Sequence, residues 1–241
     1  MSSAHVRTAL RVAFLLAMTV SGVAAQNDEP IGRYIIDLRG SSVSLGRNEE
    51  LARVRRLRPE QLPPRGIAVD LGGHFYFLRL GPVTFGLGAS ILSAAAQQPV
   101  VEPMPEEQTP GRFNPFMPQD PTADDEGEME PLIEGIPVTS RFTAISPQIT
   151  FNFGHRNGWS YVGGGLGTSR LNVYPQQPTT PVQRGARTLN YGGGARWFLT
   201  PNVALSLDLR FFAISPLEQL GEQPGSPRQT LMAANIGVSV R

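Results

Sequence analysis

The sequence contains no cysteine among its 241 residues, and all 21 of its basic residues are arginine. The lack of cysteine excludes a disulfide framework, and it leaves no thiol for a lipid anchor at the start of a mature chain. The lack of lysine excludes a P-loop. Two glycine-rich segments, 163–167 and 192–194, also lack the spacing of a G-x-G-x-x-G dinucleotide-binding loop.

Histidine is scarce as well, with three residues in the chain. Only His74 and His155 lie beyond residue 25, so a three-histidine zinc site is excluded, and no H-E-x-x-H pattern occurs. The segment 42–46, SVSLG, lacks the leading glycine of a nucleophile elbow. His74 shares a strand parity with Asp70, and we interpret it as a packed interior histidine. We therefore expect no catalytic residue, no cofactor and no metal site.

Long apolar runs are missing apart from one near the start of the chain. Val12–Val20 is too short for the roughly 20 residues that a helix needs to span a bilayer. It follows two arginines and precedes the small residues Val-Ala-Ala at 23–25, which is the arrangement of a secretory signal peptide. We expect residues 1–25 to be removed and the mature chain to begin at Gln26. The net charge then changes from +1 to −1 (19 arginines against 20 acids). The net charge therefore does not show the basic excess that is typical of nucleic-acid-binding proteins.

The remaining sequence shows a hydrophobic period of two, which predicts β-strands. In 66–78 one parity carries large apolar side chains and the other carries mainly small or polar ones: Ile67, Val69, Leu71, Phe75 and Phe77 against Ala68, Asp70, Gly72, His74 and Tyr76. Eight segments qualify, each near the length of about 9 to 11 residues that a tilted transmembrane strand needs: Arg33–Leu45, Gly66–Leu78, Val83–Ala94, Ser140–Phe153, Trp159–Leu171, Thr188–Leu199, Val203–Ile214 and Thr230–Arg241.

The connections between these segments alternate in length. Three are short and contain turn-forming residues: RLGP at 79–82, GHRNG at 154–158 and TPN at 200–202. Four are long: 46–65, 95–139, 172–187 and 215–229. In an antiparallel up-and-down sheet every second connection lies at the same end, so we expect all the long loops at one rim.

Two of the long loops have opposite charge. The loop 95–139 is acidic and rich in proline, and this composition predicts a disordered segment. The first loop, 46–65, carries six arginines against three glutamates. Attraction between the two loops, or between the basic loop and anionic lipid head groups, remains open.

Periodicity alone is compatible with two kinds of closed barrel. A soluble lipocalin-like barrel turns its apolar face inward around a ligand, whereas a transmembrane barrel turns that face toward lipid. Gly86, Gly88, Gly192 and Gly194 share the less apolar face. A narrow lumen needs small residues beside large ones, and a soluble exterior does not, so the glycines favour the transmembrane barrel.

Aromatic residues near strand ends predict the interfacial girdles of a membrane barrel: Tyr34, Phe151, Phe153, Trp159, Tyr161, Trp197 and Phe211. The segment 159–171 leaves its facing open. Trp159 and Tyr161 occupy one parity there, and Val162 and Leu166 occupy the other.

Two stretches, YVGGGLGTSRL at 161–171 and YGGGARWFLTPNVALSLDLRFF at 191–212, resemble the OmpA-type eight-stranded outer-membrane β-barrel superfamily. The resemblance covers essentially all of 26–241. It implies an all-β fold, an eight-stranded antiparallel up-and-down transmembrane β-barrel with short periplasmic turns and long extracellular loops. The resemblance identifies no residue of this chain as catalytic. The chain departs from the family in lacking the peptidoglycan-binding domain of full-length OmpA, and in ending NIGVSVR where the family usually ends on an aromatic residue.

The resemblance also implies a location in the bacterial cell outer membrane. The expected partners are outer-membrane lipids and the barrel-insertion machinery, with no nucleic acid, and we expect a monomer. We predict a structural or surface-interaction protein and not an enzyme. A narrow channel or carrier for small apolar or amphipathic solutes, as in OmpW-like barrels, and an outer-membrane acyl-chain enzyme are the alternatives.

If the apolar parity faces lipid, three acids and three arginines face the lumen: Asp37, Arg39, Asp70, Arg196, Asp208 and Arg210. Eight strands enclose an interior that side chains fill. Charges left unpaired there are costly, so we expect these six to pair with one another. The expected result is a plugged barrel and not an open pore.

Overall fold

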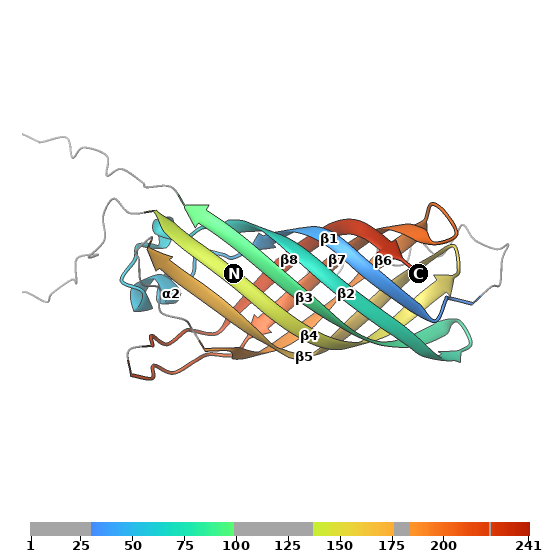
Figure 1. The fold of residues 1–241 in the computed structure, drawn as a ribbon. Coiled ribbons are helices and arrows are strands. Elements are labelled where there is room, and N and C mark those ends of the chain that lie inside the picture. The colour runs from blue at the N-terminus through green and yellow to red at the C-terminus, as the bar shows by residue number, and fades with distance from the viewer. Residues whose placement is uncertain (1–29, 99–136, 176–183, 222) are drawn as a thin grey trace, which may run out of the picture.

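The computed structural model describes residues 30–98, 137–175, 184–221 and 223–241, in which eight antiparallel strands form a closed barrel (Figure 1). Each strand pairs with the next along the chain, and the last closes onto the first, which confirms the predicted up-and-down topology. The predicted signal peptide, 1–25, lies outside the described residues. The strands are β1 (Tyr34–Ser44), β2 (Arg65–Leu80), β3 (Val83–Gln98), β4 (Val138–His155), β5 (Gly158–Pro175), β6 (Ala186–Phe198), β7 (Val203–Ile214) and β8 (Gln229–Val240).

The strand bounds differ from the predicted ones mainly at the long-loop end. β3 runs on to Gln98, which pairs with Val138 at the start of β4, so both strands extend into the segment predicted as an acidic loop. β5 likewise runs to Pro175, where its partner is again Val138. The ladder continues because Ala94 and Ala96 keep placing small apolar side chains on the inner face. Residues 99–136 of the predicted loop lie outside the described residues.

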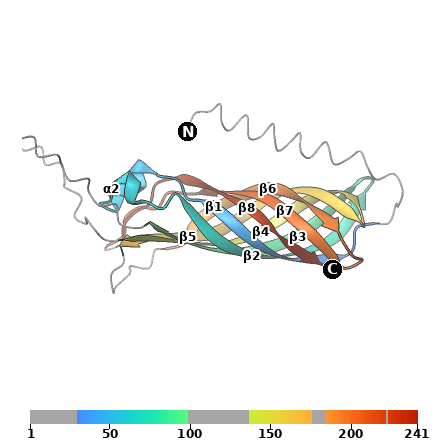
Figure 2. The ribbon, with the colours of Figure 1, turned by 90° about the horizontal axis from the view of Figure 1, so that it is seen from above.

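The two ends of the barrel are built differently. A short helix, α2 (Glu49–Val54), lies in the connection between β1 and β2, at the end opposite the C-terminus in both views (Figures 1 and 2). The connections at the C-terminal end are tight turns, and Gly81 between β2 and β3 has a φ of 57°, a conformation that favours glycine. The long connections therefore share one rim, as predicted.

The exterior of the barrel is apolar. Ile67 on β2 is 83% exposed, whereas Asp70 on the opposite face of the same strand is 3% exposed. Large apolar side chains point outward along all eight strands, which is the reverse of a soluble barrel, so the lipocalin-like alternative is wrong. This exterior is that of a transmembrane barrel whose outer face contacts lipid. In the part of the chain that the structure describes, no helix is long and apolar enough to cross a membrane.

The facing of β5 is decided by the structure. Trp159 is only 2% exposed and points into the barrel with Tyr161, whereas Leu166 is 66% exposed and points outward. The predicted place of Trp159 and Tyr161 in an interfacial girdle is therefore wrong. Tyr161 has room inside because of Gly194 on β6, where a Cβ would lie 2.9 Å from the tyrosine oxygen. Other predicted girdle residues do lie on the exterior: Tyr34, Phe151, Phe153 and Trp197.

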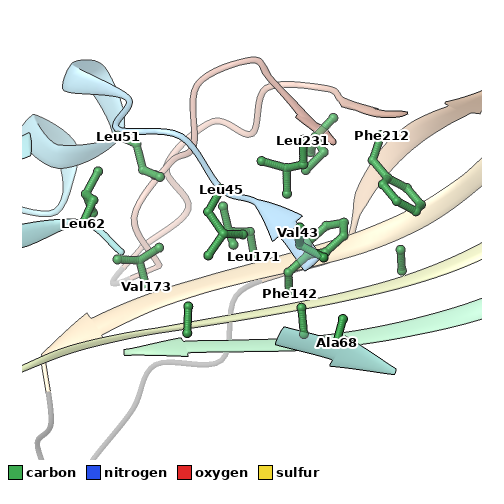
Figure 3. Close-up of a cluster of buried hydrophobic side chains, with 14 of the residues drawn as sticks. Val43, Leu45, Leu51, Leu62, Ala68, Phe142, Leu171, Val173, Phe212 and Leu231 are labelled. Atoms are coloured by element: carbon green, nitrogen blue, oxygen red, sulfur yellow. The ribbon is translucent and has the colours of Figure 1, made fainter. Parts of the chain in front are cut away.

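An apolar cluster fills the barrel at the long-loop end, as Figure 3 shows. Phe142 from β4 and Phe212 from β7 meet there edge to face, with ring centroids 5.4 Å apart. Leu51 from α2 and Leu62 pack against this cluster from the first long connection. The basic loop is therefore ordered over the mouth of the barrel, and not simply a solvated connection.

Local interactions explain why the first long connection folds in this way. Asn48 caps α2 by accepting a hydrogen bond from the backbone N–H of Leu51 at 2.9 Å. A 3₁₀ turn, η2 (Pro59–Gln61), follows and begins with a proline, which suits the first turn of a helix. Leu51, Leu57 and Leu62 are thereby buried in the barrel cluster, while the arginines between them stay at the surface or half-buried.

A second, aromatic cluster fills the short-turn end. Ile35 from β1 and Tyr76 from β2 meet Trp159 there. Tyr76 and Trp159 are edge to face with ring centroids 5.9 Å apart, and the ring centroid of Phe198 lies 5.1 Å from that of Trp159. The polar part of the lumen thus lies between two apolar layers.

Candidate functional site

The six charged residues expected in the lumen all lie there, in the layer between the two apolar clusters. Along β1, Ile35 belongs to the aromatic cluster and Val43 to the other, with Asp37 and Arg39 between them. The strand places these side chains inside because every second residue faces inward. Each of the six is at most 5% exposed: Asp37, Arg39, Asp70, Arg196, Asp208 and Arg210.

Arg196 and Asp37 form a bidentate pair. Arg196 Nε donates to Asp37 Oδ1 at 3.0 Å, and its Nη2 donates to Oδ2 at 2.7 Å. Ser239 on β8 donates a further hydrogen bond to Asp37 Oδ1. The guanidinium carbon of Arg196 also lies 4.2 Å from the ring centre of Tyr161, within the range of a cation–π contact. Both charged groups are therefore held by several partners at once.

Arg39 lies at the centre of the network. Its Nε donates to Asp70 Oδ2 at 2.8 Å, and its Nη2 lies 2.6 Å from the same oxygen. Its Nη1 donates to the Tyr161 hydroxyl at 3.1 Å. The same nitrogen is 3.8 Å from Asp208 and 4.0 Å from Asp37, so one guanidinium faces all three lumen carboxylates.

Asp208 and Arg210 pair along one face of β7. Arg210 donates to the two Asp208 oxygens at 3.3 and 3.0 Å, and it also donates to Gln148 on β4. Asp208 accepts hydrogen bonds from the Tyr161 hydroxyl and from Asn235 Nδ2, each at 2.7 Å. This carboxylate is satisfied by two neutral donors and one arginine, with Arg39 close by.

The neutral members of the network were not identified from the sequence. Tyr161, Gln148, Asn235 and Ser239 all hydrogen-bond to the charged residues. The strand register explains two of them, because Asn235 is the direct partner of Asp208 and Ser239 is the direct partner of Asp37. Once the pairing of β8 is known, its inward-facing polar residues point to these contacts.

His74 lies inside the barrel and is enclosed by the network. Its Nδ1 is 3.4 Å from Asp37 Oδ2, and its Nε2 is 3.0 Å from Gln148 Nε2. The ring is 4% exposed, and a Cβ built on Gly88 of β3 would clash with it. Among the described residues, no group of three histidine, aspartate or glutamate side chains has the geometry to hold a metal ion. The arrangement joins strands across the lumen through charge pairs and presents no open reactive group.

No protein-family model matches the chain, and no curated protein matches it either. Among solved structures, Neisserial surface protein A is similar at 11% identity with a TM-score of 0.47, covering 86% of this chain and 96% of the other. Ail, the attachment invasion locus protein of Yersinia pestis, is similar at 13% identity with a TM-score of 0.43, covering 88% of this chain and 98% of the other. The N-terminal β-barrel domain of Pseudomonas aeruginosa OprF is similar at 8% identity with a TM-score of 0.41, covering 86% and 96%.

The fold is the eight-stranded antiparallel barrel to which the sequence resemblance points. Its polar interior and apolar exterior are those of an outer-membrane barrel.

Proposed function

We propose that the protein is an outer-membrane barrel closed by its own side chains, and that it acts as a structural or surface-interaction protein. The observation that carries the proposal is the bidentate pair of Arg196 and Asp37 inside the lumen. Three arginines balance three acids in this layer, so the charges satisfy one another and need no column of water. An open pore requires the opposite, an interior whose polar groups face solvent.

Two further layers support the closed lumen. Trp159, Tyr76 and Phe198 fill the short-turn end. Phe142 and Phe212 fill the long-loop end, where the first connection packs over them. A solute that follows the barrel axis meets an aromatic layer, an ionic layer and an apolar layer in turn. Small-solute transport thus requires rearrangement of all three.

The interior offers little support for an enzyme. An acyl-chain enzyme needs an accessible base near the outer rim, whereas His74 lies in the middle of the lumen and is enclosed by Asp37 and Gln148. The surfaces that remain open to partners are the lipid-facing exterior and the rim of long connections. We place the function of the barrel on those surfaces.

Single-channel recording in planar bilayers tests the closed lumen. The purified wild-type protein, shown to be folded by its heat-modifiable mobility in gels, is expected to give no steady current above the lipid baseline. The lumen variant Arg39→Ala/Phe142→Ala/Trp159→Ala/Arg196→Ala removes large buried side chains from all three layers and is expected to conduct. Leu38→Ala/Ile145→Ala/Trp197→Ala/Leu207→Ala is the matched control, because it shortens four side chains on the exterior of the barrel.

The outcomes are distinct. A large, steady, ungated current from the wild type overturns the closed lumen. Saturable retention of an apolar solute by a non-conducting wild type favours the carrier alternative and contradicts the proposed role. The proposal is supported if the wild type and the exterior control give no steady current and the folded lumen variant conducts.

A further inference from the structure

Three arginines stand on the exterior at the long-loop ends of adjacent strands. Arg141 lies on β4, Arg170 on β5 and Arg187 on β6. Each has neighbours on both sides that face into the barrel, so its own side chain faces outward, and all three are exposed. We call these residues the arginine stripe.

The strand register makes the stripe continuous. Arg170 is the direct partner of Thr143, which lies two residues from Arg141 along β4. Arg187 is the direct partner of Thr168, which lies two residues from Arg170 along β5. Each arginine is therefore a diagonal neighbour of the next, a separation of about 7 to 8 Å that long side chains cover easily.

The Arg170 side chain leans toward β6. A Cβ built on Gly185, just before β6, would lie 3.9 Å from Arg170 Nε, so the side chain lies beside the start of β6, two residues from Arg187. β4 and β5 run side by side to the long-loop end in Figure 1, and β6 pairs with β5 up to Ala186.

The stripe has no counter-charge in the part of the chain that the structure describes. No carboxylate there forms an ion pair with Arg141, Arg170 or Arg187. The lumen arginines show the contrast, because each of them contacts at least one aspartate. Three neighbouring positive charges repel one another, and an anion placed between them removes that cost.

The depth of the stripe identifies the kind of anion. Thr143 and Thr168 come next along the exterior, and the lipid-facing apolar surface then begins with Ile145, Leu166 and Leu189. The stripe thus lies at the edge of the apolar band, at the level of lipid head groups. The short-turn ends of β4 and β6 present aromatic side chains, Phe153 and Trp197, on the same surface. Only one leaflet therefore meets this row of charges on these strands.

We propose that the arginine stripe binds the phosphate groups of a lipid in the leaflet on the long-loop side. Guanidinium groups bind phosphate through paired, charge-assisted hydrogen bonds, and a row of three matches a head group with more than one phosphate. The side chains project sideways from the barrel wall, so the ligand that reaches them is part of the surrounding membrane and not a solute above the rim. The site depends on the barrel's lying in lipid, and it is independent of whether the lumen conducts.

The test compares wild type with Arg141→Gln/Arg170→Gln/Arg187→Gln in phosphatidylcholine nanodiscs that contain purified diphosphoryl lipid A. Native mass spectrometry of the extracted protein measures the retained lipid. The matched control is Arg47→Gln/Arg53→Gln/Arg56→Gln, which removes the same charge from exposed positions in the first long connection. Lipid A without its phosphates, in otherwise identical nanodiscs, isolates the contribution of the head group.

The wild type and the control are expected to retain the phosphorylated lipid about tenfold or more over the dephosphorylated one, and the stripe variant is expected to lose this preference. Equal loss in the control shows general attraction to the rim and overturns the proposal. Equal retention by the stripe variant also overturns it. Binding of inorganic pyrophosphate to the stripe without lipid A assigns the site to a free anion, which contradicts the membrane ligand.

Discussion

Arg196 on β6 and Asp37 on β1 are 159 positions apart in the sequence, yet two hydrogen bonds of 3.0 and 2.7 Å join them. Their strands are not neighbours in the sheet, so the pair crosses the lumen. Arg39 links this pair to Asp70 and Asp208. The charged layer therefore connects strands on different sides of the barrel without any backbone contact.

The first prediction concerns the energy of this pair. Asp37→Ala leaves Arg196 buried without its bidentate partner, and it is expected to lower the free energy of unfolding by about 3 to 5 kcal/mol. The double variant Asp37→Ala/Arg196→Ala is expected to lower the free energy of unfolding by less than the sum of the two single variants. Each single variant leaves one buried charge without its partner, whereas the double variant removes both charges. Reversible urea unfolding in phospholipid vesicles measures both. If the loss in the double variant equals the sum of the two single losses, the two residues are not energetically coupled.

The second prediction concerns the outward face of β7. Leu207 points to lipid, and Leu207→Arg is expected to cost about 2 to 4 kcal/mol if it lies near the bilayer midplane. Leu199→Arg is the matched control, since Leu199 is also exposed but lies beyond the end of β6 in a short turn. Vesicle unfolding should rank Leu207→Arg as clearly the worse. The reverse ranking would place the turn, and not the strand centre, in the apolar core.

The third prediction concerns a glycine that gives the lumen its space. A Cβ on Gly194 would clash with the Leu207 carbonyl oxygen and lie 2.9 Å from both Asp208 Cα and the Tyr161 oxygen, so Gly194→Ala pushes the backbone of β7 and the network away from β6. We expect a loss of about 1 to 3 kcal/mol, the usual range for overpacking. Gly40→Ala, where the nearest atom is 3.9 Å away, is the control and should be nearly neutral. Vesicle unfolding of the two alanine variants checks this difference.

The fourth prediction concerns the connection that packs over the barrel mouth. Leu51 is buried against the barrel cluster, whereas Val54 on the same helix is exposed. Leu51→Ala is therefore expected to release α2 and speed tryptic cleavage after Arg53 and Arg56, while Val54→Ala is not. Timed digestion in vesicles, with the fragments identified by mass, measures the two rates. Equal rates would show that the helix is held by something other than Leu51.

Much of the fold follows from local pattern. In 66–78 and 203–214, large apolar residues occupy most positions of one parity, and a strand sends successive side chains to opposite faces. The division of these residues between two faces was therefore predictable before any pairing was known, and the glycines on the less apolar face indicated which one points inward. The short turns were predictable as well, because turn-forming residues interrupt the alternation at fixed points.

Other features lacked a local signal. In 159–171 both parities carry large side chains, and periodicity does not say which of Trp159 and Leu166 enters the barrel. The first long connection reads as a basic loop because its leucines are isolated in the sequence. They become a continuous surface only when α2 and η2 bring Leu51, Leu57 and Leu62 to the barrel mouth.

The sequence by itself determined the number of strands, their facing on most of the chain and the charges that enter the lumen, because these depend on alternation along a single strand and on the small residues of one face. Only the tertiary structure decided that Arg196 pairs with Asp37, that Tyr161 joins Arg39 to Asp208, and that the loop at 46–65 packs over one end. Those contacts depend on the stagger and tilt with which eight strands close. That closure sets which side chains meet across the lumen, and no local pattern encodes it.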